Sequence, residues 1–203
     1  MTIPVIQEAQ RDEDLVSLAQ VGDEAAFTEL VHRHESRVYT LALNMLRNPG
    51  DAEDVLQETF ISALHGLKSF RGDSSFSTWL YRIAYNNTLM KLRKPATAVS
   101  LDAALEGPES EIPRELTDWT HEPESELLNQ EAREMMQEAV ETLSPPLRAV
   151  FVLRELDGLS TEETASVLNV SIQVVKTRLH RARMILRNQL SEYYRARRAS
   201  ERN

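Results

Sequence analysis

The chain has 203 residues, 41% of them apolar, with 23 basic and 32 acidic side chains and a net charge of −9. This length suits one domain or two small ones, and the absence of cysteine excludes disulfide scaffolds, thiol nucleophiles, thiolate zinc sites and iron–sulfur clusters. No apolar run approaches the roughly 20 residues that cross a bilayer, and the first residues lack the features of a signal peptide, so we expect a cytoplasmic protein. Long helical patterns with only six glycines favour an all-α fold.

The negative charge is concentrated in one segment of the chain. Residues 97–130 carry a single basic residue, Arg114, against nine acidic ones, and they contain three prolines and little periodicity. Such a segment is typical of a linker. We therefore predict two small helical domains, residues 1–96 and 125–203, joined by a flexible acidic linker, residues 97–124.

Each predicted domain contains a basic stretch despite the acidic total. Residues 68–94 hold six basic side chains and one acidic one, and residues 171–191 hold five basic side chains and no acidic one. Solvated helix faces can also be basic, but two separate basic patches on an acidic chain favour a protein that contacts nucleic-acid phosphates at two places.

The first domain begins with helical periodicity from Asp14, which runs to a predicted break at residues 48–50. Asp51 is then expected to cap the next helix, since its carboxylate can accept backbone N–H bonds. The start of that helix is strongly acidic (Asp51, Glu53, Asp54, Glu58). These acids either compensate the helix dipole and aid solubility or form a docking surface for a basic partner, and their spacing fits both interpretations.

A polar loop at residues 69–75 leads to a predicted helix over residues 76–93 that mixes aromatic, amide and basic side chains. Aromatic rings beside basic groups suit single-stranded nucleic acid, because bases stack on the rings while the cations follow the phosphates. Trp79 is expected to pack inside. The better candidates for exposed stacking are Phe70, Tyr81 and Tyr85.

In the second domain, a long amphipathic helix over residues 125–142 is predicted to precede a short helix capped by Ser144. Ser160 and Glu163 form a predicted capping box. Asn169 tolerates the left-handed conformation of a tight turn, and Ser171 is expected to cap the final helix.

The two helices on either side of Asn169 predict a helix-turn-helix, whose second helix would enter the major groove of DNA. Apolar residues are predicted to face inward (Val174, Val175, Leu179, Ala182, Leu186). Arginine can pair with guanine and glutamine with adenine, although each side chain could equally contact phosphate. The candidates to contact DNA are Gln173, Lys176, Thr177, Arg178, His180 and Arg181.

No pattern in the chain indicates a catalytic or metal site. His180 has no second ligand at a suitable spacing, and His32 and His34 point to different helix faces, so we expect both as surface residues. There is no glycine-rich phosphate loop, metal-binding HExxH pair or nucleophile elbow. The sequence therefore predicts a protein without catalysis, metal or cofactor.

Three blocks of sequence together resemble one protein family. The blocks are DAEDVLQETF at residues 51–60, FRGDSSFSTWLYRIA at residues 70–84, and LRELDGLS at residues 153–160 followed by VKTRLHRAR at residues 175–183. In this order, on either side of an acidic linker, they are similar to the small two-domain extracytoplasmic-function (ECF) group of bacterial RNA polymerase sigma factors.

The resemblance implies three binding surfaces. One would dock on the largest subunit of core RNA polymerase through Asp51, Asp54, Gln57 and Glu58. A second would hold an unstacked base of the downstream, minus-ten promoter element, through Phe70, Arg71, Asp73, Ser74, Tyr81, Arg82, Tyr85, Asn86 and Lys91. The helix-turn-helix would read the upstream, minus-thirty-five element through Gln173, Lys176, Thr177, Arg178, His180 and Arg181. The resemblance also implies an anti-sigma factor as a partner.

One departure and one alternative remain. Many relatives carry Gly-Thr where this chain has Gln173 and Val174, so the promoter preference at that position stays open.

A free-standing helix-turn-helix regulator would explain residues 143–190 but leave the first domain without a role. It would bind DNA without polymerase, whereas a sigma factor would bind DNA weakly until core polymerase is present.

Overall fold

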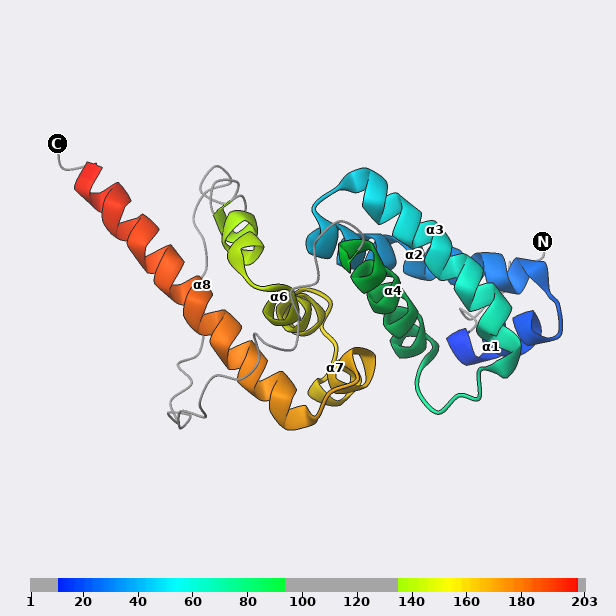
Figure 1. Ribbon diagram of the computed structural model, residues 1–203. Helices are drawn as coiled ribbons and strands as arrows, with labels where there is room; N and C mark the ends of the chain where they lie inside the picture. Colours follow the sequence, from blue (N-terminus) through cyan, green and yellow to red (C-terminus); the bar gives the residue numbers. More distant parts are fainter. Residues whose placement is uncertain (1–10, 94–134, 201–203) are drawn as a thin grey trace, which may run out of the picture.

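The computed structural model describes residues 11–93 and 135–200, and within these two stretches every regular element is helical. The predicted linker, residues 97–124, lies outside the described residues, as does the start of the predicted helix 125–142. The all-α prediction is confirmed, with one group of helices before residue 94 and another after residue 134 (Figure 1).

The first group contains four α-helices and a short 3₁₀ turn, which are α1 (Asp12–Gln20), α2 (Glu24–Leu46), α3 (Pro49–Gly66), η1 (Leu67–Ser69) and α4 (Phe76–Arg93). The second group contains a helical segment at 135–142, α6 (Pro145–Phe151), the π-helical turn η2 (Val152–Leu156), α7 (Thr161–Leu168) and α8 (Ile172–Ser200). α8, the longest of these helices, extends to Ser200.

The helix boundaries follow from local chemistry. α2 begins where the Asp23 side chain accepts a hydrogen bond from the Ala26 amide at 3.0 Å. It ends at Leu46, and the next residue, Arg47, has a left-handed φ of 60°. α3 starts earlier than predicted. Its cap is Asn48, whose side chain accepts from the Asp51 amide at 3.1 Å, and Pro49 occupies the first turn. The prediction that Asp51 is the cap was therefore wrong. Asp51 lies inside the first turn of α3, and its backbone amide is the group that Asn48 caps.

The signals around the helix-turn-helix are confirmed. Glu163 N donates to Ser160 Oγ at 3.1 Å and Ser160 N donates to Glu163 Oε2 at 2.8 Å, which completes the capping box of α7. Asn169 has a φ of 53°, and the Ser171 hydroxyl accepts from the Val174 amide at 3.3 Å at the start of α8. Ser144 precedes α6, but its side chain makes no capping hydrogen bond.

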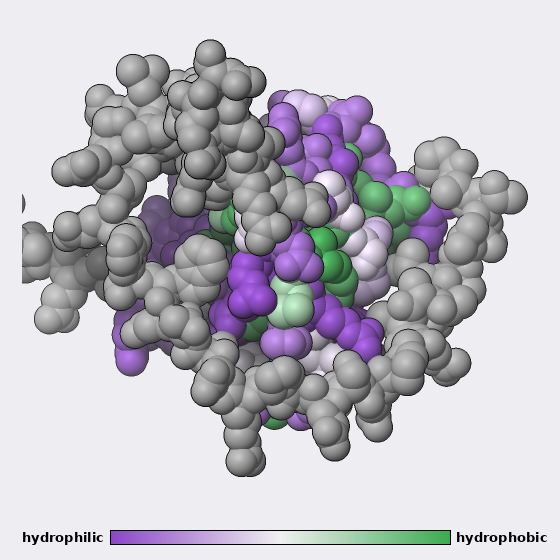
Figure 2. Space-filling view, turned by 90° about the vertical axis from the view of Figure 1, so that its left-hand side faces the viewer, coloured by the Kyte–Doolittle hydropathy of each residue, from purple (hydrophilic) through white to green (hydrophobic). Residues whose placement is uncertain are grey.

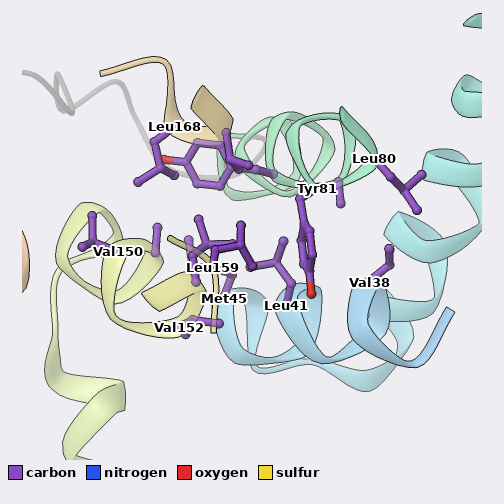
Figure 3. Close-up of a cluster of buried hydrophobic side chains, with 14 of the residues drawn as sticks. Val38, Leu41, Met45, Leu80, Tyr81, Val150, Val152, Leu159 and Leu168 are labelled. Carbon is purple, nitrogen blue, oxygen red and sulfur yellow. The ribbon is translucent and has the colours of Figure 1, made fainter. Parts of the chain in front are cut away.

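A single apolar cluster joins the two groups of helices. Figure 3 shows Leu41 and Met45 of α2 beside Tyr81 of α4, with Val152 and Leu159 of the second group packed against them. All five side chains are buried. The two domains therefore pack closely in this structure, and their contact positions the candidate sites.

Candidate nucleic-acid interface

The predicted polymerase-docking residues lie on α3. The buried side of this helix is formed by Ala52, Val55 and Thr59. Asp54, Gln57 and Glu58 are exposed, and Asp51 is half-buried. The strip is therefore available to a partner molecule.

An unexpected ion-pair cluster connects this acidic strip to a predicted DNA contact. Lys91 Nζ of α4 lies 2.7 Å from Asp51 Oδ1 and 2.7 Å from Asp54 Oδ2. The hydrogen bonds to Asp51 and then Asp54 raise the pKa of Lys91. Lys91 was expected to follow DNA phosphates, and in this structure it binds the carboxylates that were expected to meet the polymerase.

The loop after η1 presents its centre to solvent and anchors its ends. Phe70 is half-buried, 4.9 Å from Trp79 and 6.2 Å from Phe76 between ring centroids. Arg71 and Asp73 are exposed and form an ion pair at 3.0 Å. Trp79 packs against the apolar cluster as predicted, but the expectation of an exposed Phe70 ring was only partly right, since the ring packs on its neighbours.

The two tyrosines of α4 are not exposed, contrary to the prediction. Tyr81 is 3% exposed and Tyr85 is 7% exposed, because both join the apolar cluster shared by the two domains. Burial raises the pKa of Tyr81, and nearby Asp157 of the second domain raises it further. Burial also raises the pKa of Tyr85, while the charge of Arg178 on α8 opposes that shift. Neither ring can stack on a base in this arrangement.

Arg82 binds the helix-turn-helix directly. Its Nε donates to the Ser166 carbonyl at 3.1 Å and its Nη2 donates to the Ser166 hydroxyl at 2.5 Å. Ser166 belongs to α7, and Asn86, one turn after Arg82, is exposed. Part of the predicted minus-ten surface is thus occupied by the protein's own second domain.

The buried and exposed faces of the recognition helix α8 agree with the prediction at most positions. Val175, Leu179, Ala182 and Leu186 are buried, whereas Val174 is half-buried. Among the predicted DNA contacts, Gln173 and Lys176 are exposed, and four others are half-buried: Thr177, Arg178, His180 and Arg181. In Figure 2, the described surface on the side of the second domain mixes hydrophilic and hydrophobic residues.

Sequence reasoning missed the groups that hold the domains together. The guanidinium of Arg148 donates to the carbonyls of Met45 at 3.1 Å, Glu141 at 2.7 Å and Leu143 at 2.9 Å, and Met45 lies in the first domain. Desolvation lowers the pKa of Arg148. The only sequence signal is an arginine within an otherwise apolar turn, which does not identify its distant partner.

Asp157 is a half-buried residue at the contact, with one buried carboxyl oxygen. Its Oδ2 has no hydrogen-bond partner among the described residues. Burial raises the pKa of Asp157 to about 6, and the charge of Arg37 on α2 opposes the shift. The interaction with Arg37 and with Tyr81 places this carboxyl against the first domain.

The histidine prediction was wrong at one position. His34 is buried, with its Nε2 2.6 Å from Asp12 Oδ2, because α1 folds over this face of α2. His32 is exposed as predicted. Across residues 11–93 and 135–200, no group of three metal-ligating side chains gathers, and no helix there is long and apolar enough to span a membrane.

Two family models match the chain in the order that the motifs predicted. Sigma-70 region 2 matches residues 30–97, and Sigma-70 region 4 matches residues 133–186. The chain is 38% identical over 190 residues to the ECF RNA polymerase sigma-E factor of Escherichia coli, covering 91% of this chain and 97% of that protein. It is 37% identical to the ECF RNA polymerase sigma factor SigW of Bacillus subtilis, covering 84% and 92%.

Solved structures agree with this relationship. CnrH, solved in complex with the cytosolic domain of CnrY, superposes with a TM-score of 0.65 at 29% identity and covers 89% of this chain and 97% of CnrH. The sigma factor RpoE, solved with the anti-sigma factor NepR from Bartonella quintana, has the same fold, with a TM-score of 0.61 at 24% identity over 81% of this chain and 96% of RpoE. The fold and the two matched regions define a two-domain transcription factor of the sigma-70 type. The chain belongs to the ECF sigma factor family.

Proposed function

We propose that this protein binds core RNA polymerase in the bacterial cytoplasm, directs it to promoters with two elements, and helps to melt the downstream element. The observation that carries the proposal is the pair of sigma-70 regions, in order, in a chain that matches ECF sigma factors along most of its length. The protein would use no cofactor and have no catalytic activity of its own, since specificity and melting require only binding energy.

Each surface receives a role in this proposal. The acidic strip of α3 would dock on a basic face of the polymerase, through Asp51, Asp54, Gln57 and Glu58. The loop and α4 would hold the unstacked downstream base, and extracting this base from the duplex costs a few kcal/mol. The residues proposed to hold it are Phe70, Arg71, Asp73, Ser74, Tyr81, Arg82, Tyr85, Asn86 and Lys91. The recognition helix would read the upstream duplex (Gln173, Lys176, Thr177, Arg178, His180, Arg181).

The closed packing of the domains supports a requirement for polymerase. Tyr81 and Tyr85 are buried and Arg82 is bound to Ser166, so these side chains reach DNA only when the domains separate. Docking on core polymerase would stabilise the separated arrangement. CnrH was solved with the cytosolic domain of CnrY and RpoE with an anti-sigma factor, and we expect an anti-sigma factor for this chain as well.

Run-off transcription with core polymerase on pooled genomic fragments tests the proposal. With the protein present, new transcript starts should share two upstream elements at a fixed spacing. No new starts, together with no binding to core polymerase, would reject the sigma function and favour a free-standing helix-turn-helix regulator that binds duplex DNA alone.

Two sets of variants separate the surfaces. Asp54→Lys with Glu58→Lys should abolish binding to core polymerase. Glu35→Lys with Glu138→Lys makes the same charge change at exposed positions outside the acidic stretch of α3 and should retain it. Arg178→Ala or Arg181→Ala should weaken use of the upstream element and spare polymerase binding. Equal loss of both activities would show that these arginines do not serve DNA recognition.

A further inference from the structure

Gln20, the last residue of α1, reaches across to the segment that precedes the exposed loop. Its Nε2 donates to the Leu67 carbonyl at 3.0 Å and to the Phe70 carbonyl at 2.8 Å. Leu67 begins η1 and Phe70 follows its end. A single side-chain amide therefore ties both ends of this turn to a helix about 50 residues earlier in the chain.

The two hydrogen bonds fix where the loop begins. Phe70 is held with its ring 4.9 Å from Trp79 and 6.2 Å from Phe76. The other end of the loop is fixed by Ser75, whose Oγ accepts from the Thr78 amide at 3.2 Å. Between these anchors, Arg71, Gly72 and Asp73 are exposed. The φ of Gly72 is 76°, which only glycine adopts without strain.

α1 is itself rigidly attached, so that Gln20 is a fixed reference point. Leu15 and Val16 are buried in the apolar cluster. At the opposite end of the helix, Asp12 binds Arg33 Nη1 at 3.1 Å and His34 Nε2 at 2.6 Å, both from α2. Without the bonds of Gln20, the helix is thus attached to α2 through Asp12 and to the apolar cluster through Leu15 and Val16.

We propose that Gln20 is a positioning residue for base recognition: by pinning the Leu67 and Phe70 carbonyls, it sets the place of the loop that receives the unstacked promoter base. The inference rests on the proposed function of residues 70–75. A pocket for one base must be held to within a fraction of an ångström if it is to distinguish that base from the others. Gln20 would contribute to discrimination between bases without contacting DNA.

Two substitutions of Gln20 separate the loss of the hydrogen-bond donors from the loss of side-chain length. Gln20→Met keeps the length of the side chain and removes both N–H donors. Gln20→Lys restores donors on a flexible chain of similar reach. Ser17→Ala is the matched control, because it also removes one hydrogen bond from a side chain of α1, the bond from Ser17 Oγ to the Glu13 carbonyl at 2.8 Å, but on the exposed face.

The test uses the full chain assembled with core polymerase and labelled single-stranded oligonucleotides of the downstream element found by transcript mapping. Affinity is measured for the natural sequence and for oligonucleotides with the unstacked base replaced by each of the other three. Gln20→Met should reduce the ratio of natural to replaced affinity roughly tenfold, about the effect of one or two hydrogen bonds. Gln20→Lys should recover part of the ratio, and Ser17→Ala should leave it unchanged.

Three outcomes would overturn the inference, and they differ in what else they overturn. If the unsubstituted protein does not discriminate between bases, the proposed role of the loop fails together with that of Gln20. If it does discriminate and Gln20→Met retains the full ratio, only the role of Gln20 fails. A Gln20→Met protein that loses affinity for all four oligonucleotides equally, with a lower thermal midpoint, would show that Gln20 merely stabilises the fold.

Discussion

Arg82 of α4 donates two hydrogen bonds to Ser166 of α7, one to its carbonyl and one to its hydroxyl. Arg82 belongs to the predicted minus-ten surface and Ser166 to the first helix of the helix-turn-helix. This contact therefore occupies part of the predicted minus-ten surface with the first helix of the helix-turn-helix. Because the pair is largely exposed, each hydrogen bond contributes modestly, about 0.5–1.5 kcal/mol, so that the closed arrangement can be opened by a binding partner.

Ser166→Ala should shift the free protein toward the open arrangement, by a few-fold in the ratio of open to closed molecules, because one of the two hydrogen bonds is lost. The chain has no cysteine, so Glu35→Cys and Asn188→Cys provide unique, exposed labelling sites for fluorescence transfer between the domains. Ser191→Ala is the matched control, since its hydroxyl bonds only within α8, to the Arg187 carbonyl. An unchanged distance distribution in Ser166→Ala would show that this contact does not restrain the domains.

The closed arrangement should depend on pH through Asp157. Burial in the contact raises its pKa to about 6 from an ordinary 3.8, and opening would return it toward the ordinary value. The protonated carboxyl favours the closed form, so that closure weakens as the pH rises from about 4 to about 6 and then levels off. The full effect is at most about 3 kcal/mol, lessened by the partial exposure of the group.

Asp157→Asn removes the charge at nearly constant shape and should keep the domains closed as firmly at about pH 7 as at about pH 4. The same labelled protein reports the transfer efficiency at each pH. If the unsubstituted and substituted proteins follow the same pH profile, the dependence arises from a different group.

Lys91→Met should strengthen binding to core polymerase two- to fivefold at low salt. Lys91 neutralises Asp51 and Asp54, and its removal leaves their charge available to a basic partner. The effect is small because exposed ion pairs contribute about 0–1 kcal/mol. Arg93→Met, an exposed cation at the end of the same helix, is the control for lost positive charge. Weaker binding of Lys91→Met would mean instead that Lys91 holds the carboxylates in their docking positions.

Arg148→Met should destabilise the protein by about 2–4 kcal/mol, because three carbonyls would lose their donor in a buried place. Urea denaturation followed by circular dichroism measures the change. Arg187→Met, an exposed substitution on α8, should leave the midpoint nearly unchanged. A similar midpoint for both variants would show that water replaces the lost hydrogen bonds at no cost.

The elements that could be predicted from sequence are those with local causes. The capping box of Ser160 and Glu163 and the left-handed Asn169 depend on residues within a few positions, and both are confirmed. The cap of α3 was missed by three residues because Asn48 and Asp51 are both acceptable caps. Helical periodicity also assigned the inward side of α8 correctly at four positions, whereas Val174 is half-buried.

The errors concern contacts between segments far apart in the chain. Tyr81 and Tyr85 lie off the main apolar stripe of their helix, so periodicity predicts exposure, and only the packing of the second domain buries them. Gln20 and Arg148 each bind carbonyls of residues outside their own helix. Because every residue has a backbone carbonyl, the sequence does not indicate which one is the partner. The roles of the docking and DNA-binding side chains remain predictions for the variants above.

The shared apolar cluster has a consequence for how this sequence can change over generations. Tyr81 and Tyr85 fit the second domain in the closed form and, on the proposed function, unpaired bases in the open one. A substitution at either position must therefore be compatible with two environments, the second domain in the closed form and an unpaired base in the open form. An aromatic ring can both fill an apolar pocket and stack on a base. We therefore expect these positions to tolerate few replacements, even in relatives that read different promoters.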